Sequence, residues 1–213
     1  MISRVTGPAR IERLALADLL TDVGPDAPTL CEGWTTRDLA AHLILRERHP
    51  VAAAGIAFPR LRERTARHQA KVARRDFTKL LHDLRRPPVW SLLSNPLLDE
   101  AVNVNEMFVH HEDVRRAQPG WSPRTLSPQL QAELFSRVRK TARLFLRKLP
   151  LSVVLDAPRH GVIEAGGGGP AVKVTGDPAE LALFIYGRQQ VSKVEITGDP
   201  AGVERLRNAR LGV

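Results

Sequence analysis

The chain has 213 residues, of which 43% are hydrophobic and 26% are charged, and its formal net charge is +9. This composition is typical of a globular protein of one or two domains, and it excludes disordered, collagen-like and coiled-coil chains. The longest apolar run, residues 51–58, is far shorter than the roughly 20 residues that cross a bilayer, and the N-terminus lacks an apolar signal segment. We therefore expect a soluble, cytoplasmic protein with no membrane partner.

Helical spacing of apolar residues dominates the first two thirds of the chain. Gly24-Pro25, Pro50 and Pro119-Gly120 interrupt it, whereas Asn95-Pro96 and Ser127-Pro128 have the cap-and-proline pattern of helix starts. The predicted helices cover residues 9–23, 36–48, 60–84, 96–117 and 128–149.

The hydrophobic period changes from 3.6 to 2 after Pro150, which predicts short strands at 152–156, 161–165 and 171–175. The sequence Thr-Gly-Asp-Pro-Ala occurs at 175–179 and again at 197–201, and each copy has the pattern of a strand end followed by a capped helix start. We therefore expect an α+β protein. It would have a bundle of four to five helices over residues 1–149 and a small α/β domain over residues 150–213.

The positive charge is unevenly distributed. Residues 46–88 hold 12 basic and 4 acidic residues, and residues 137–148 hold 6 basic and no acidic residues. The basic helix within residues 60–86 is either a solvated helix or an electrostatic surface for nucleic acid or another anion. It carries one aromatic residue, Phe77, and no recognition motif, so a nucleic-acid partner is the less favoured expectation.

Three residues form a candidate metal site. Glu106 and His110 are four positions apart, which places their side chains one turn apart on the same face of the predicted fourth helix. His42 lies on an apolar turn of the second helix and can supply a third ligand. Two imidazoles and one carboxylate leave coordination positions open for water or substrate, as in catalytic metal sites.

Other interpretations of these residues stay open from the spacing alone. A Glu and a His four apart also form ordinary ion pairs on helices, and His111 or Asp113 could supply a fourth ligand that closes the site into a non-catalytic one. The single cysteine, Cys31, excludes an internal disulfide and an all-cysteine zinc site. It can act as a reactive thiol or simply be buried.

Three segments of the chain resemble the mycothiol-dependent maleylpyruvate isomerase family. They are Leu30–Leu43 (LCEGWTTRDLAAHL), residues 105–116 with the run HHEDVRRAQPGW at 110–121, and Gly187-Arg188. The N-terminal part of this family belongs to the DinB-like helical-bundle superfamily, and the run at 110–121 is most similar to an actinobacterial metal-binding subgroup. The resemblance extends over nearly the whole chain and implies the same bundle followed by a small α/β domain.

The resemblance implies a divalent metal ion, usually zinc, on His42, Glu106 and His110. It further implies a low-molecular-weight thiol such as mycothiol as cofactor, an electrophilic substrate, and an isomerase or transferase reaction. Arg188 is a candidate for binding a substrate carboxylate, with a surface salt bridge as its alternative role. The resemblance leaves the catalytic residues, the substrate and the oligomeric state open, because one fold serves many reactions.

Overall fold

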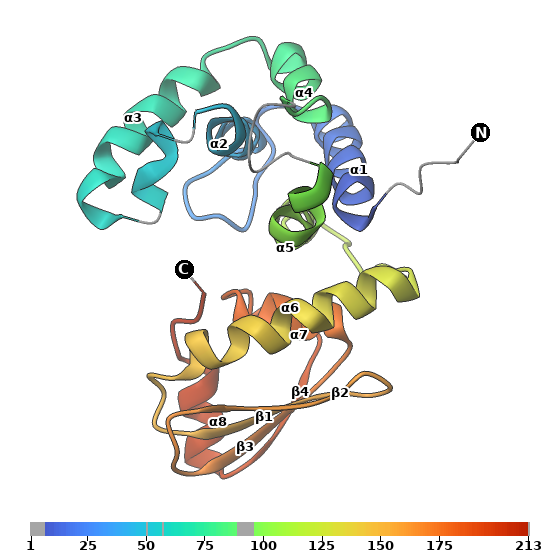
Figure 1. Ribbon diagram of the computed structural model, residues 1–213, viewed down its shortest axis with the longest axis vertical. Helices are drawn as coiled ribbons and strands as arrows, with labels where there is room; N and C mark the ends of the chain where they lie inside the picture. Colours follow the sequence, from blue (N-terminus) through green and yellow to red (C-terminus); the bar gives the residue numbers. More distant parts are fainter. Residues whose placement is uncertain (1–6, 50, 57, 89–95, 213) are drawn as a thin grey trace. The chain divides into compact units, whose positions relative to one another are not determined.

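The structure is a computed structural model, and it describes residues 7–49, 51–56, 58–88 and 96–212; the side chains of Ile56 and of residues 96–102 are not described. Its contacts divide the chain into two compact units, Met1–Ser122 and Pro123–Val213. Each unit has its own arrangement of elements, shown in Figure 1. No helix among the described residues is long and apolar enough to cross a membrane.

The N-terminal unit is all helical. Its α-helices are α1 (Pro8–Val23), α2 (Thr36–Arg48), α3 (Arg62–Ala73), α4 (Phe77–Arg85) and α5 (Pro96–Arg115), and two short 3₁₀ helices, Ala52–Ile56 and Pro59–Leu61, precede α3. α1 packs against α5 and α4, and α2 packs against α3 and α4. Their apolar stripes meet in a core of fully buried aliphatic side chains such as Leu16, Leu39 and Leu84.

The prediction of a single basic helix within residues 60–86 is wrong. α3 ends at Ala73, and α4 begins at Phe77 after a break. Asp76 causes the new start, because its side chain accepts a hydrogen bond from the backbone N–H of Lys79 at 3.0 Å. In the sequence, helical spacing continues across this break. Only the capping residue, Asp76, indicates where the second helix starts.

The C-terminal unit combines a mixed sheet with three helices. Its elements are α6 (Pro128–Leu146), β1 (Ser152–Ala157), β2 (Gly161–Gly166), β3 (Ala171–Thr175), α7 (Pro178–Ile185), β4 (Glu195–Gly198) and α8 (Pro200–Arg207). The strand order is β2-β1-β3-β4, with β1 antiparallel to β2 and parallel to β3, and β3 antiparallel to β4. Alternate residues of β1 and β3 are buried, so helices cover one face of the sheet.

The repeated Thr-Gly-Asp-Pro-Ala sequence begins α7 and α8. Pro178 and Pro200 are the first residues of these helices, and Asp177 and Asp199 are their N-caps. Only the Asp199 side chain makes the capping hydrogen bond, at 2.7 Å from the N–H of Gly202. The three predicted strands and both helix starts are thus present, and the α+β class is confirmed.

The contacts of α6 set the division between the units. This helix packs against α7 and β2 of the C-terminal unit, so the division falls after Ser122. The sequence places it after residue 149, because α6 has the same helical period as the segments before it. Periodicity identifies a helix but does not show which neighbours its apolar stripe will contact.

The glycine-rich turn after β2 is required by close backbone contacts. A Cβ atom on Gly166 would collide with the carbonyl oxygen of Leu151, and the φ angle of Gly166 is +102°. Only glycine fits both the conformation and the space. The turn therefore connects β2 to β3, and it is not a phosphate-binding loop because a strand, not a helix N-terminus, follows it.

Candidate metal centre

α2 brings His42 to the interior of the N-terminal unit. The helix starts at a capping interaction in which the backbone N–H and the hydroxyl of Thr35 both donate to the Asp38 carboxylate, at 3.0 and 2.8 Å. His42 follows one turn later among buried aliphatic residues and is 8% exposed. The indole of Trp34 lies against its ring, with 5.0 Å between centroids, and helps to fix the ring in place.

α5 carries Glu106 and His110 one turn apart, as their spacing predicts. Oε1 of Glu106 lies 3.3 Å from Nε2 of His42 and 3.4 Å from Nε2 of His110. The two imidazole rings are 5.3 Å apart between centroids and nearly perpendicular, at 70°. One carboxylate oxygen thus lies between the Nε2 atoms of two histidines from different helices.

These three side chains meet a geometric requirement for binding a metal ion. Their ligand atoms all lie within 4.8 Å of one another. The two histidines are 8% and 9% exposed, whereas the Glu106 side chain is 26% exposed, so the group is partly open to solvent. Two imidazole nitrogens with one carboxylate oxygen form a donor set that suits zinc and other divalent transition metals.

The charges within this group are strongly coupled. Burial raises the pKa of Glu106, but hydrogen bonds from His110 and His42, together with the charges of His110 and Arg46, outweigh it and lower that pKa well below its usual range. Burial lowers the pKa of His110, but hydrogen bonds to Asp113, Cys31 and Glu106 raise it well above its usual range. In the metal-free protein, Glu106 is therefore ionised and His110 is protonated at neutral pH.

Asp113 holds His110 from the far side of its ring. Nδ1 of His110 donates to Oδ2 of Asp113 at 2.9 Å, and the Asp113 side chain is fully buried. This contact turns Nε2 toward Glu106 and His42. In metal sites, a carboxylate that accepts from the other ring nitrogen commonly orients the metal-binding histidine in this way. From the sequence, Asp113 is predicted only as a possible fourth ligand. The spacing of three residues from His110 was the signal that it could orient this histidine instead.

Cys31 also lies beside Nδ1 of His110, the outer nitrogen of this ring, which faces away from Glu106. Its Sγ is 3.3 Å from Oδ2 of Asp113 and 3.9 Å from Nδ1 of His110. The loop that carries it is tied to α5 by a hydrogen bond from the N–H of Leu30 to the carbonyl oxygen of Asp113, at 3.0 Å. Cys31, His110 and Asp113 form a second group of possible metal ligands, which shares His110 with the first.

His111 faces a different partner. Its Nδ1 donates to Oε2 of Glu12 in α1 at 2.9 Å, and both side chains are buried. Among the residues that the structure describes, the group formed by His42, Glu106 and His110 includes no fourth ligand atom. The alternative in which His111 or Asp113 closes the coordination shell therefore finds no support in this arrangement.

Arg46 is a further neighbour of the group, which the sequence motifs did not identify. Its Nε lies 3.6 Å from Oε1 of Glu106, and its Nη1 donates to Oδ1 of the buried Asn103 at 2.6 Å. The signal for it was its place four residues after His42, which puts it on the same face of α2. It adds a fixed positive charge beside the carboxylate.

Arg188 lies in the C-terminal unit, immediately after the positive-φ residue Gly187. Its Nη1 donates to the backbone carbonyl oxygen of Tyr186 at 2.6 Å. This local hydrogen bond fixes the guanidinium next to the end of α7. The role of Arg188 in substrate binding stays a prediction.

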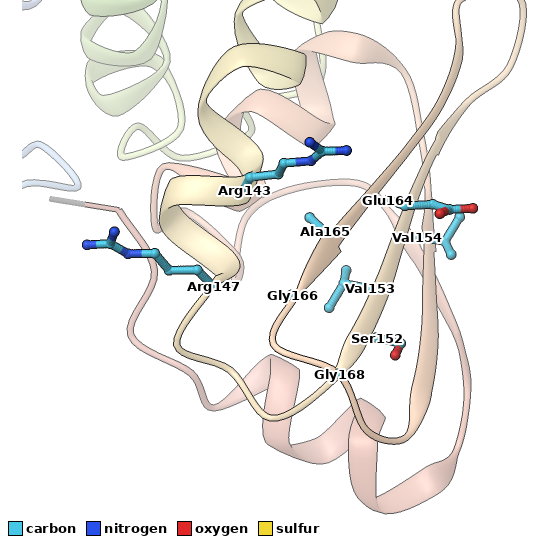
Figure 2. A pocket seen from close by; sticks show the side chains of 9 residues that line it. All are labelled: Arg143, Arg147, Ser152, Val153, Val154, Glu164, Ala165, Gly166 and Gly168. Carbon is cyan, nitrogen blue, oxygen red and sulfur yellow. The ribbon is translucent and has the colours of Figure 1, made fainter.

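A pocket of about 570 Å³ lies in the C-terminal unit, between the end of α6 and the β1–β2 hairpin (Figure 2). Arg143 and Arg147 line it from α6, and Glu164 lines it from β2. In Figure 2 the Arg143 side chain extends toward the strands, whereas that of Arg147 extends in the opposite direction. The two guanidinium groups do not converge on one point, so the candidate site for chemistry is the group in the N-terminal unit.

The fold and the site define a class: an α+β protein in which a helical unit carries a His₂-Glu group and a second unit carries a small mixed sheet. Residues 8–87 match the family model described as the mycothiol maleylpyruvate isomerase N-terminal domain. The match is confined to this N-terminal region of the chain, and it agrees with the resemblance of Leu30–Leu43 to the same family.

Solved structures share this fold over most of the chain. A crystal structure of the mycothiol-dependent maleylpyruvate isomerase is 18% identical, with a TM-score of 0.52, and a histidine-to-alanine mutant of that isomerase is 17% identical, with a TM-score of 0.54. Each alignment covers 89% of this chain and 90% of the other. A comparison with curated proteins found no match.

Proposed function

We propose that the protein binds one divalent metal ion, zinc, on His42, Glu106 and His110. We further propose that it uses this site with a low-molecular-weight thiol such as mycothiol, as an isomerase or a thiol transferase. The observation that carries the proposal is the convergence of two Nε2 atoms and one carboxylate oxygen within 4.8 Å. The family of residues 8–87 supports the thiol, since its description names mycothiol.

The donor set fits a catalytic metal ion better than a structural one. Three protein ligands leave positions open, and the partly exposed Glu106 keeps the group in contact with solvent. A divalent ion bound there would lower the pKa of a coordinated thiol, so that a nucleophile exists at neutral pH. The thiolate would then add to an electrophilic substrate.

The remaining residues position these ligands and set the local charge. Asp113 accepts the hydrogen bond from Nδ1 of His110 and so keeps Nε2 directed at the site. Arg46 stands beside Glu106 and adds to the hydrogen bonds and charge of the histidines that lower the pKa of that carboxylate. Its positive charge also favours anionic ligands at the site, such as a thiolate or a substrate carboxylate. Arg188 is a further candidate for binding a substrate carboxylate.

The first test is the metal content of protein purified without an affinity tag, measured by mass spectrometry. Wild type should hold about one divalent ion per chain, and His42→Ala, Glu106→Ala and His110→Ala should each lose it while remaining folded. His111→Ala is the matched control, because this histidine is adjacent in sequence and bonded to Glu12 instead. Wild-type protein that stays empty after incubation with zinc, nickel, manganese and iron would contradict the proposal.

The second test separates the thiol from the metal. Cobalt(II) loaded into the site reports on its ligands by visible absorption, so addition of mycothiol should change the spectrum of wild type. A cobalt-loaded protein whose spectrum does not respond to mycothiol or to another small thiol would retain the metal site and refute the thiol-dependent activity.

A further inference from the structure

α3 presents one face made of basic side chains. Arg64, Arg67, His68 and Lys71 are all exposed, and together they line a hollow of about 430 Å³. We call these four residues the basic face of α3. Their spacing of three, four and seven residues from Arg64 places them on one side of the helix over two turns.

Charge compensation of the basic face within α3 is limited to one acid, the exposed Glu63, which lies four residues before Arg67. Among the described residues, none of the four makes an ion pair with a carboxylate, and His68 contacts only the carbonyl oxygen of Arg64, at 3.1 Å. Asp83 of α4 is paired with Arg48 and Arg75, at 3.3 and 2.6 Å. Like charges one turn apart repel each other and destabilise a helix, so the arrangement favours an anionic ligand that neutralises them.

The opposite side of α3 is fully used by the protein itself. The Thr65 hydroxyl donates to the carbonyl oxygen of Ala52 at 2.5 Å and accepts from the N–H of Gly55 at 2.9 Å. Val72 and Ala73 belong to the core, packed with aliphatic residues of α2. The basic face therefore points outward, and α3 has no apolar face left to insert into a membrane.

We propose that the basic face of α3 binds the phosphodiester backbone of nucleic acid, without reading its sequence. Arg64 and Lys71 are separated by seven residues, or about 10 Å of helix axis, which is about three base-pair steps of duplex DNA. Arginine and lysine are the side chains that contact phosphates most often, and a basic surface along one helix is typical of such binding. This function is separate from the metal centre.

The binding test uses the full chain and a fluorescently labelled 20-base-pair DNA duplex, followed by fluorescence anisotropy. Nonspecific binding in the micromolar range is expected at low salt. Three phosphate contacts predict that the affinity falls about 40-fold between 50 and 200 mM salt, from a slope of about −0.9 per contact. No binding at 50 mM salt, or binding that does not depend on salt, would overturn the proposal.

Two triple variants with the same change in charge locate the binding surface. Arg64→Gln/Arg67→Gln/Lys71→Gln removes two arginines and one lysine from the basic face. Arg139→Gln/Lys140→Gln/Arg143→Gln removes the same residue types from exposed positions of α6. The first should bind DNA at least tenfold more weakly than wild type, and the second within about twofold. Equal losses in both variants would show a general charge effect and overturn the proposal.

Two further measurements distinguish nucleic-acid binding by this surface from binding at the metal centre and from binding to a membrane. His42→Ala should bind DNA as wild type does, since the basic face does not include the metal centre; a loss would contradict the proposal. Vesicles containing phosphatidylserine test the membrane, because Phe58 and Leu61 are 62% and 39% exposed just before α3. Vesicle binding without DNA binding would assign the surface to a membrane and overturn the proposal.

Discussion

His110 and His111 are neighbours on α5, and each donates a hydrogen bond of 2.9 Å to a carboxylate. Their surroundings differ in one respect that decides what each can do. His111 forms a buried pair with Glu12, whereas His110 directs its second nitrogen toward an oxygen of Glu106 that His42 also contacts. Residue types alone do not distinguish the two histidines; the convergence of several donors at one point does.

The pair formed by His111 and Glu12 is part of a larger set of buried charged residues in the N-terminal unit. Arg13 forms a two-point ion pair with Glu47, at 2.9 and 2.5 Å, and Glu112 accepts from Nε of Arg116 at 2.6 Å. These side chains are 1–4% exposed. Each charge has its own partner within the protein, so this region stabilises the fold, whereas the His110 side keeps coordination capacity for a ligand.

The largest expected effect comes from breaking the stabilising region. Arg13→Ala leaves the Glu47 carboxylate buried without its partner, and should lower the free energy of unfolding by about 3–5 kcal/mol. Urea denaturation measures the loss. The metal content per folded chain should stay at the wild-type value, and a change below about 1 kcal/mol would contradict the role given to this pair.

The same substitution at each of the two neighbouring histidines tests their different roles. His111→Gln should destabilise the protein by about 2–3 kcal/mol, because a buried carboxylate loses its donor, and it should keep the metal. His110→Gln should lose the metal and cost a similar amount of stability, because the fully buried Asp113 carboxylate loses the N–H of His110. Denaturation and metal analysis of both variants test this; the comparison fails if both histidines prove necessary for metal binding.

Asp113→Asn keeps the size of the side chain while removing its charge. An amide holds Nδ1 of His110 less strongly, so metal affinity should fall about 10- to 100-fold. Competition with a zinc indicator measures the dissociation constant. Unchanged affinity would mean that Asp113 does not orient the ligand.

The raised pKa of His110 predicts how metal binding depends on pH. In the metal-free protein, His110 is protonated at neutral pH, and its proton must leave before Nε2 can bind a metal ion. Affinity should therefore increase with pH, about tenfold per unit below the pKa of His110, until the proton is lost. Glu106 is already ionised in this range and adds no slope. A dissociation constant that is the same at pH 6, 7 and 8 would contradict this coupling.

The smallest effect is expected at Cys31, which lies beside the outer nitrogen of His110. If the metal binds on the Nε2 side, Cys31→Ser should retain about one ion per chain and change the affinity by less than about threefold. A loss of the ion in this variant would place it instead among Cys31, His110 and Asp113.

Much of the secondary structure follows from sequence patterns because the signals are local. The predicted helix at 128–149 is α6, Pro128–Leu146, which begins with Ser127 accepting from the N–H of Leu130 at 3.2 Å. Glu106 and His110 could be paired from their spacing, since helix geometry fixes which residues share a face. The positions where helices break and the elements against which they pack were harder to predict, as the interruption at Asp76 and the contacts of α6 show.

Buried charges were the main feature that the sequence concealed. Helical spacing places His111, Glu112 and Arg116 away from the side of α5 that carries Glu106 and His110, yet they are 5%, 1% and 4% exposed. Polar residues on a helix usually indicate a solvent-exposed face. The partners that allow these residues to be buried, such as Glu12, lie about a hundred residues away in the chain. Pairing across helices depends on tertiary structure, which periodicity does not contain.

The central claim is that one divalent ion binds between His42, Glu106 and His110. Anomalous diffraction at the zinc absorption edge, from crystals of the zinc-loaded protein, tests it most directly. The account predicts one strong peak bounded by Nε2 of both histidines and the Glu106 carboxylate. A peak on the Cys31 and Asp113 side of His110, or no peak in the N-terminal unit, would contradict it.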